Sequence, residues 1–147
     1  MNEFSYYLYY YIQDINFASH KTDKMDNKEL ALRAITDVFV NRDITAFDRY
    51  FSKDYKQHNP GIPNGTEVLK QIVPTFPADF NYEPGIVAES GDFVMIHGRY
   101  ENWNGKNMIA VDIFKIEDSK ISEHWDVMQE EVPAAESANG NVMFPII

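Results

Sequence analysis

Hydrophobic positions in the first half of the chain recur at the spacing of amphipathic helices. Asp26 and Glu29 have the spacing of a capping box, and an apolar stripe follows them. Thr66 is expected to cap a later helix that ends before Pro74. Three helices are therefore predicted, over residues 27–40, around 47–51 and over 66–72.

From Phe80 onward the hydrophobic period changes to the alternation of β-strands. Turn residues separate four alternating segments, and Asn104-Gly105 between two of them is a strong hairpin signal. The strands are expected at residues 80–89, 93–101, 107–117 and 120–129. Helices followed by an antiparallel meander predict an α+β fold, with the helices packed against one face of a curved sheet.

Residues 1–24 follow neither period, although they carry five of the nine tyrosines of the chain. We expect them to form an N-terminal extension, with a single domain over residues 25–147. An aromatic arm that packs on a partner subunit is the functional alternative for this extension. The tail from Val132 ends in an apolar stretch and is expected to pack on the domain.

Charge and composition narrow the class of protein. The 147 residues carry 13 Lys+Arg and 23 Asp+Glu, which gives a formal net charge of −10. This excess of acidic over basic residues argues against binding to nucleic acid or to an anionic membrane surface. The chain has no cysteine, which excludes disulfides and thiolate ligands, and no apolar run long enough to span a bilayer. No signal peptide is recognisable, so we expect a soluble cytoplasmic protein.

Asp112 is the most informative single residue, because aspartate is disfavoured inside strands. Alternation places it on one strand face with Phe114. An apolar environment raises the pKa of a carboxyl group toward neutrality, which suits a general acid or base. The alternative is a structural carboxylate that lies at a sheet edge or pairs with Arg99 or Lys106.

Other polar groups share faces with large apolar side chains on the neighbouring strands. Alternation groups His97 with Met95, and His124 with Asp126. If these faces coincide on the side covered by the helices, all of them line one enclosed pocket with Asp112. The remaining candidates lie near the expected mouth of this pocket and are Tyr55, Gln57 and His58.

Established catalytic motifs are absent from the chain. It has no Gly-x-Ser-x-Gly elbow, no phosphate-binding glycine-rich loop and no dinucleotide fingerprint. No His-x-His or His-Glu-x-x-His spacing supports a metal site built from the histidines and one carboxylate. We therefore expect no metal and no cofactor.

Three segments carry a family resemblance. They are Tyr55-Lys56-Gln57-His58-Asn59-Pro60, Val111-Asp112-Ile113-Phe114 and Glu123-His124-Trp125-Asp126-Val127. Together with the helical start, they resemble the SnoaL-like polyketide cyclase family over the stretch from Met25 to Gln129. The resemblance implies the cone-shaped nuclear-transport-factor-2-like (cystatin-like) fold, in which a curved, mostly antiparallel sheet wraps around N-terminal helices. It also implies an enclosed pocket and a homodimer formed through the sheet.

The resemblance further implies a chemistry. In this family a strand aspartate is the acid/base of an intramolecular aldol condensation that needs no cofactor, and Asp112 matches that position, with His97 similar to its companion. We expect a cyclase, lyase or isomerase that acts on a small hydrophobic carbonyl compound. Asp112 would remove a proton next to a carbonyl, and His97 or His124 would donate to the enolate oxygen. A non-catalytic pocket for a small ligand and an oligomerisation module remain alternatives.

Overall fold

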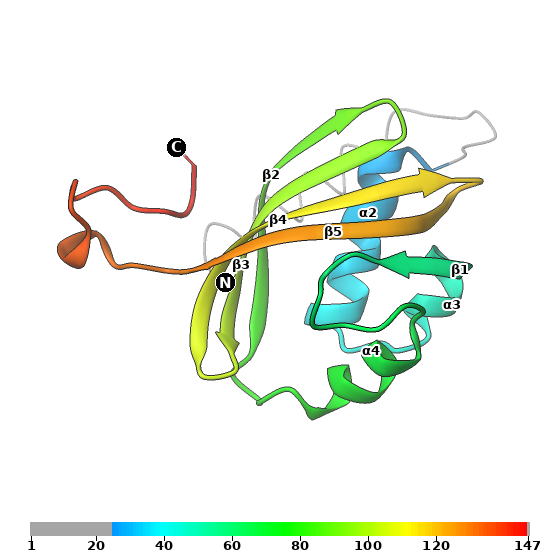
Figure 1. Ribbon diagram of the computed structural model, residues 1–147, viewed down its shortest axis with the longest axis horizontal. Helices are drawn as coiled ribbons and strands as arrows, with labels where there is room; N and C mark the ends of the chain where they lie inside the picture. Colours follow the sequence, from blue (N-terminus) through cyan, green and yellow to red (C-terminus); the bar gives the residue numbers. More distant parts are fainter. Residues whose placement is uncertain (1–24, 147) are drawn as a thin grey trace, which may run out of the picture.

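One five-stranded mixed sheet organises the molecule, and the computed structural model describes it over residues 25–146 (Figure 1). The helices lie together on one side of this curved sheet, so the fold is α+β, as predicted. The predicted extension over residues 1–24 lies outside the described residues. No helix within residues 25–146 is long and apolar enough to cross a membrane.

The helices follow the predicted stripes, with differences at their ends. Asp26 caps α2 (Asn27–Ile35) by accepting a hydrogen bond from the Glu29 backbone N–H at 2.7 Å. The helix continues as the wider π-helix η1 (Thr36–Val40). The other helical elements are α3 (Ala46–Tyr50), α4 (Glu67–Ile72) and the 3₁₀ turns η2 (Val73–Thr75) and η3 (Ala134–Glu136). Thr66 is the N-cap residue of α4, as predicted, but its side chain makes no capping hydrogen bond.

The four strands of the meander were predicted, and a fifth strand was not. The strands are β1 (Phe51–Gln57), β2 (Asn81–Ser90), β3 (Phe93–Trp103), β4 (Lys106–Glu117) and β5 (Lys120–Glu130). They lie in the order β1-β5-β4-β3-β2, and β1 pairs with β5 in parallel. The short second helix therefore ends at Tyr50, and Phe51 begins an edge strand instead of closing that helix.

The hydrophobic core fills the space between the helices and the concave face of the sheet. Leu30, Ala34 and Val38 point from α2 and η1 toward buried strand residues such as Val94 and Ile96. Burying this apolar surface is the main stabilising term of the fold. The inward set of β3 thus consists of Val94, Ile96, Gly98 and Tyr100, and its outward set includes Met95 and His97.

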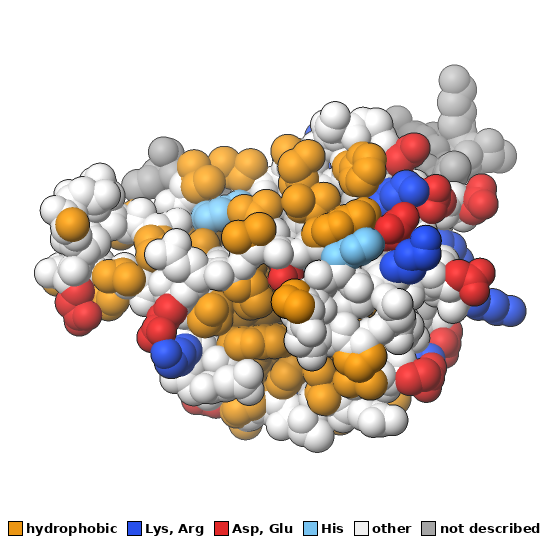
Figure 2. Space-filling view, in the orientation of Figure 1, with side chains coloured by type: hydrophobic (Ala, Val, Ile, Leu, Met, Phe, Trp, Pro, Cys, Tyr) orange, Lys and Arg blue, Asp and Glu red, His pale blue; other side chains and the backbone are white. Residues whose placement is uncertain are grey.

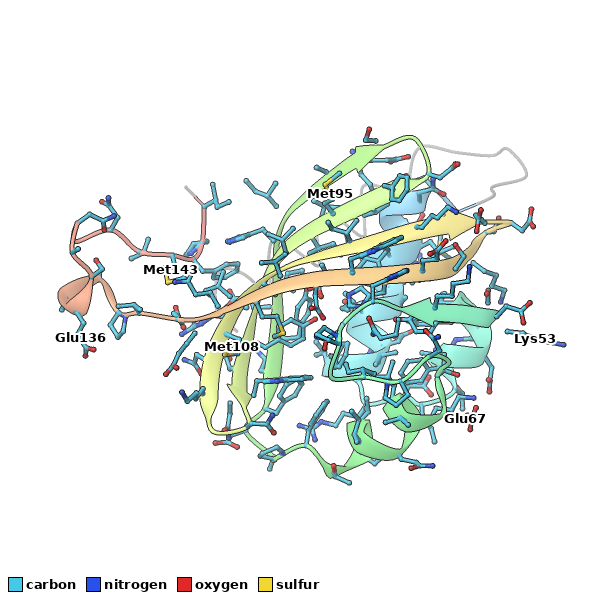
Figure 3. The ribbon with its side chains drawn as sticks, in the orientation of Figure 1. Lys53, Glu67, Met95, Met108, Glu136 and Met143 are labelled. Atoms are coloured by element: carbon cyan, nitrogen blue, oxygen red, sulfur yellow. The ribbon has the colours of Figure 1, made fainter. Side chains whose placement is uncertain are left out.

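The C-terminal tail covers part of the opposite, convex face of the sheet. Phe144 is buried there, and its ring stacks on His97 with 5.6 Å between the ring centroids. Gly85 leaves room for this ring, because a Cβ at that position would lie 2.8 Å from it. Met95 lies on the same convex side, on the far side of the strands from α4 (Figure 3). The end of the chain therefore packs on the domain, as its apolar pattern suggested.

Candidate active site

Asp112 lies at the centre of the molecule, on the concave face of β4. The residue is only 1% exposed, and Ala110 and Phe114 flank it on the same face. The sheet-edge alternative is wrong, because β4 pairs with both β3 and β5. The ion-pair alternative is also wrong, because Arg99 binds Glu131 and Glu101, and Lys106 binds Glu130.

Two buried tyrosines donate hydrogen bonds to Asp112. The Tyr100 hydroxyl lies 3.1 Å from each carboxylate oxygen, and the Tyr82 hydroxyl lies 3.5 Å from Oδ2. Burial raises the pKa of both tyrosines well above the ordinary value, and the negative charge of Asp112 raises it further. Both hydroxyls therefore stay protonated at neutral pH, and both act as donors that stabilise the carboxylate.

A chain of hydrogen bonds fixes the protonation of His124. The Asn59 backbone N–H can only donate, and it donates to Gln57 Oε1 at 3.0 Å, which identifies that atom as oxygen. The other amide atom of Gln57, Nε2, donates to the Tyr55 hydroxyl at 3.1 Å. Because Oε1 is also 3.0 Å from His124 Nδ1, that nitrogen must carry a hydrogen.

This assignment determines the proton count of the neighbouring pair. His124 Nε2 lies 3.1 Å from Asp112 Oδ1. With Nδ1 already protonated, this contact is attractive only if another proton lies between Nε2 and Oδ1. The pair therefore holds one shared proton and has no net charge, whichever atom binds it. The two tyrosine donors favour the form with a carboxylate and an imidazolium.

Asp126 is the second carboxylate of the site. It lies directly opposite Asp112 in the register of β4 and β5 and is partly exposed. The Asn59 side-chain amide donates to both of its oxygens, at 2.9 and 2.8 Å. Asn59 thus supports Gln57 through its backbone and Asp126 through its side chain, so the loop after β1 helps to organise both ends of the site.

Asp112, His124 and Asp126 could together ligate a cation, because one ligand atom from each lies within 4.8 Å of the others. Carboxylate oxygens and an imidazole nitrogen suit several divalent metals. However, the tyrosines and Asn59 already direct donor hydrogens at the two carboxylates. A metal would have to displace these donors and the shared proton. The expectation of a metal-free site stays a prediction.

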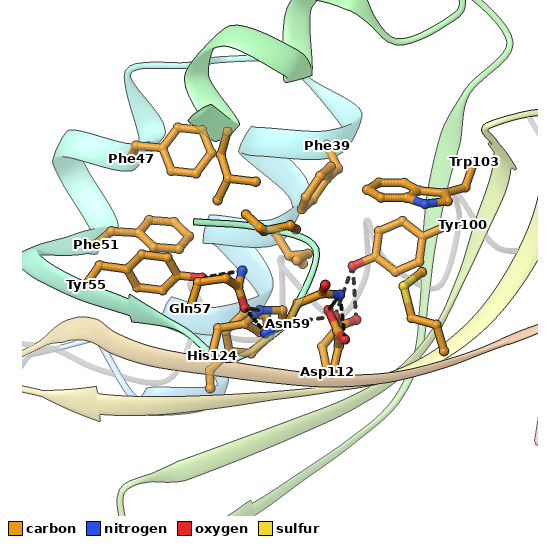
Figure 4. A pocket seen from close by; sticks show the side chains of 16 residues that line it. Phe39, Phe47, Phe51, Tyr55, Gln57, Asn59, Tyr100, Trp103, Asp112 and His124 are labelled. Atoms are coloured by element: carbon orange, nitrogen blue, oxygen red, sulfur yellow. Dashed lines mark hydrogen bonds and ion pairs between the residues drawn. The ribbon is translucent and has the colours of Figure 1, made fainter. Parts of the chain in front are cut away.

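A small apolar cavity opens above these polar groups (Figure 4). Its volume is about 50 Å³, room for roughly three to five water molecules. In Figure 2 acidic atoms are visible in a hollow surrounded by hydrophobic side chains. Apolar and aromatic side chains supply most of the wall, namely Ile35, Phe39, Phe47, Phe51, Ile62, Leu69, Trp103, Phe114 and Met128.

The structure brings six of the nine residues singled out from the sequence into this cavity. They are Tyr55, Gln57, Asp112, Phe114, His124 and Asp126. The expectation that His97 and Met95 join them is wrong, because Ile96, not His97, lies opposite Asp112 in the pairing of β3 with β4. Both residues therefore point to the convex face, where His97 packs on Phe144.

His58 also lies outside the cavity, contrary to expectation. It stacks on Trp125 with 4.2 Å between centroids, and its Nε2 lies 2.9 Å from Glu123. This hydrogen bond, followed by that from Lys115, lowers the pKa of Glu123. Trp125 alternates with His124 and Asp126 along β5 and therefore lies on the outer face, so His58 contributes to the surface of the sheet instead of the mouth.

Sequence reasoning missed Tyr82, Tyr100 and Asn59. Tyr100 has the parity of Ile96, so assigning the other face of β3 to the core would have found it. Gly98 gives a weaker signal for Tyr82: a Cβ there would lie 2.5 Å from the Tyr82 hydroxyl, so glycine leaves space for that ring. Nothing local to Asn59 points to its contact with Asp126, which is 67 positions away.

Comparisons with known proteins agree with this architecture. The family model described as SnoaL-like domain matches residues 32–124. The comparison with curated protein sequences gives no match.

Several solved structures share the fold at low identity. A nuclear-transport-factor-2-like protein of unknown function from Cytophaga hutchinsonii has a TM-score of 0.63 at 17% identity, covering 74% of this chain and 95% of its own. A candidate polyketide cyclase from Bacillus cereus has a TM-score of 0.60 at 21% identity, covering 69% and 74%. A candidate ketosteroid isomerase from Kribbella flavida has a TM-score of 0.59 at 16% identity, covering 72% and 79%. The family match spans more than half of the chain, and the protein therefore belongs to the SnoaL-like domain family.

Proposed function

We propose that this protein is a cofactor-independent acid–base enzyme that acts on a small hydrophobic carbonyl compound. The observation that carries the proposal is the Asp112–His124 pair, which shares one proton at the floor of an apolar cavity. An acid and a base held 3.1 Å apart can move protons to and from one bound molecule. The names of two similar structures, a candidate polyketide cyclase and a candidate ketosteroid isomerase, are consistent with this chemistry.

The proposed reaction begins with enolisation. The Asp112 carboxylate takes a proton from the carbon next to the carbonyl, while His124 Nε2–H donates its proton to the carbonyl oxygen. The enol then attacks a second carbonyl, which forms the new carbon–carbon bond of an aldol condensation. Asp112 returns its proton to the new alkoxide, and the enol O–H returns its proton to His124. All protons balance, and the pair regains its starting state.

An isomerisation uses the first half of the same sequence. There the enol is conjugated to a carbon–carbon double bond of the substrate, the proton held by Asp112 returns to the far carbon of that system, and the enol O–H returns its proton to His124. In either reaction Gln57 keeps Nδ1 of His124 protonated, so that Nε2 is the atom that exchanges protons. The cavity of about 50 Å³ favours a substrate of few heavy atoms, because benzene occupies an engineered cavity of ~150 Å³.

The test is the exchange of α-protons for deuterium in small ketones, followed by NMR in D₂O. We expect the protein to accelerate exchange over buffer, and Asp112→Asn to slow it by about 100-fold or more. Asp92→Asn, in an exposed turn, is the matched control and keeps full activity. If Asp112→Asn exchanges as fast as the parent protein, Asp112 is not the base. If the parent protein binds ketones without exchange, the cavity is a non-catalytic ligand site.

We further propose a cytoplasmic homodimer that associates through the convex face of the sheet. Hydrophobic side chains gather over this face (Figure 2), and Phe93, Val111 and Val127 are 38%, 37% and 71% exposed. Light scattering tests the oligomeric state. We expect Val127→Lys to give monomers, whereas Val40→Lys, on the exposed side of η1, leaves the dimer intact. A parent protein that is already monomeric would overturn this proposal.

A further inference from the structure

The cavity carries an unbalanced negative charge. Within residues 25–146, no lysine or arginine lines it, and its ionised groups are Asp112, His124 and Asp126. The shared proton makes the Asp112–His124 pair neutral in total, wherever that proton resides. The remaining charge belongs to Asp126. The site therefore presents one net carboxylate to any molecule that enters.

Asp126 has only a neutral partner among the described residues. The Asn59 amide donates to both of its oxygens, which satisfies two lone pairs but supplies no opposite charge. Elsewhere in the described fold, carboxylates such as Glu123 and Glu131 have cationic partners within 4 Å. Asp126 is thus a polar group held in position by Asn59 and without a cation of its own.

The wall beside these groups suits a cation. Phe39, Tyr100 and Trp103 form an aromatic cluster, with centroids 5.6 Å apart for Phe39–Tyr100 and 5.4 Å apart for Tyr100–Trp103. All three line the cavity (Figure 4). The faces of aromatic rings carry negative potential and attract ammonium groups, most strongly where water is excluded. Carboxylate and aromatic groups therefore favour the same sign of ligand charge.

We propose that the cavity recognises a small substrate that carries a protonated amine, with Asp126 as its counter-ion. This inference rests on the proposed function for the carbonyl half of the substrate, which makes the substrate class a small amino ketone or amino aldehyde. The ammonium group would pair with Asp126 near the aromatic cluster, and the carbonyl group would face Asp112 and His124. Carboxylate and phosphate compounds are disfavoured, because the net charge of the described lining is already negative and no lysine or arginine of residues 25–146 lines the cavity to offset theirs.

The inference is tested without turnover, by binding of three probes of similar size at pH 7: butylamine, 1-butanol and butyrate. Protein NMR shifts of the Trp103 indole and the His124 ring report occupancy, with EDTA present to remove divalent metals. A charge-assisted hydrogen bond predicts roughly tenfold to hundredfold tighter binding of butylamine than of 1-butanol. Butyrate is expected not to bind.

Matched variants show whether Asp126 causes the preference for the amine over the alcohol. Asp126→Asn keeps the shape of the side chain but removes its charge, so butylamine should then bind no better than 1-butanol. Asp92→Asn, on the exposed turn between β2 and β3, should leave the preference intact. Thermal unfolding of both variants shows that they are folded.

The outcomes separate the two proposals. Equal binding of amine and alcohol to the parent protein, or an amine preference that survives in Asp126→Asn, overturns the inference. Selective amine binding without α-proton exchange in any ketone supports the inference and contradicts the proposed reaction. Exchange in neutral ketones without any amine preference supports the proposed reaction and contradicts the inference.

Discussion

Replacing Tyr100 with phenylalanine removes one hydroxyl that donates to both oxygens of a buried carboxylate. A hydrogen bond to a charged group contributes about 1.5–3 kcal/mol, and Asp112 is 1% exposed, so bulk water does not solvate the carboxylate. We therefore expect Tyr100→Phe to lower the free energy of unfolding by about 1.5–3 kcal/mol.

Urea denaturation followed by circular dichroism measures this loss. Tyr50→Phe is the matched control, because the Tyr50 hydroxyl donates to Asp37 at 3.0 Å in a part-buried position near the surface. The Asp37 carboxylate also binds Arg49, and we expect this control to lose less than about 1 kcal/mol.

A double-mutant cycle identifies the cause. In an Asp112→Asn background the acceptor has no charge, so Tyr100→Phe should cost only about 0.5–1.5 kcal/mol. The difference between the two backgrounds is the coupling energy of the pair. If Tyr100→Phe costs no more than Tyr50→Phe, or if the cycle shows no coupling, the buried carboxylate does not depend on this donor.

Two more predictions concern the same interior. Burial raises the pKa values of Tyr55, Tyr82 and Tyr100 in the folded state, so their stabilising effect is complete below pH 10, the ordinary tyrosine value, and is lost as the pH rises further. Urea unfolding at pH 9 and pH 11 should show this loss, approaching ~1.4 kcal/mol per pH unit for each such tyrosine, with a smaller slope in Tyr100→Phe. Gly98→Ala should destabilise by about 1–3 kcal/mol in the same assay, because the new methyl group would lie 2.5 Å from the Tyr82 hydroxyl. Gly61→Ala, whose nearest neighbour would be 3.3 Å away, should cost clearly less.

Alternation grouped Asp112 with Phe114 on β4 and His124 with Asp126 on β5, and the structure brings all four side chains to the cavity. The face of β3 could not be chosen in the same way. Val94 and Ile96 alternate with Phe93 and Met95, so both faces of this strand are apolar and periodicity cannot rank them. The convex face is hydrophobic as well, and for this reason His97 was assigned to the wrong side.

Strand β1 shows a second limit of local patterns. Phe47, Phe51 and Tyr55 recur every four residues, which is a helical spacing, and the polar stretch 52–54 does not resemble a strand. What makes this segment a strand is its parallel pairing with β5, nearly 70 positions later. The contact of Gln57 with His124 depends on this pairing. The chain of hydrogen bonds that keeps His124 Nδ1 protonated could therefore not be predicted without the fold.

The order of the strands also limits how copies of this sheet can meet. Its two borders are β1 and β2, and neither offers a clean ladder of free backbone groups to another chain. Charged Lys53, Asp54 and Lys56 occupy β1, and β2 carries Pro84 with an irregular register beside it. Charges and proline at such borders oppose the addition of further strands. The assembly of many copies into a fibre by pairing of edge strands is therefore disfavoured, although the hydrophobic convex face of the same sheet remains open.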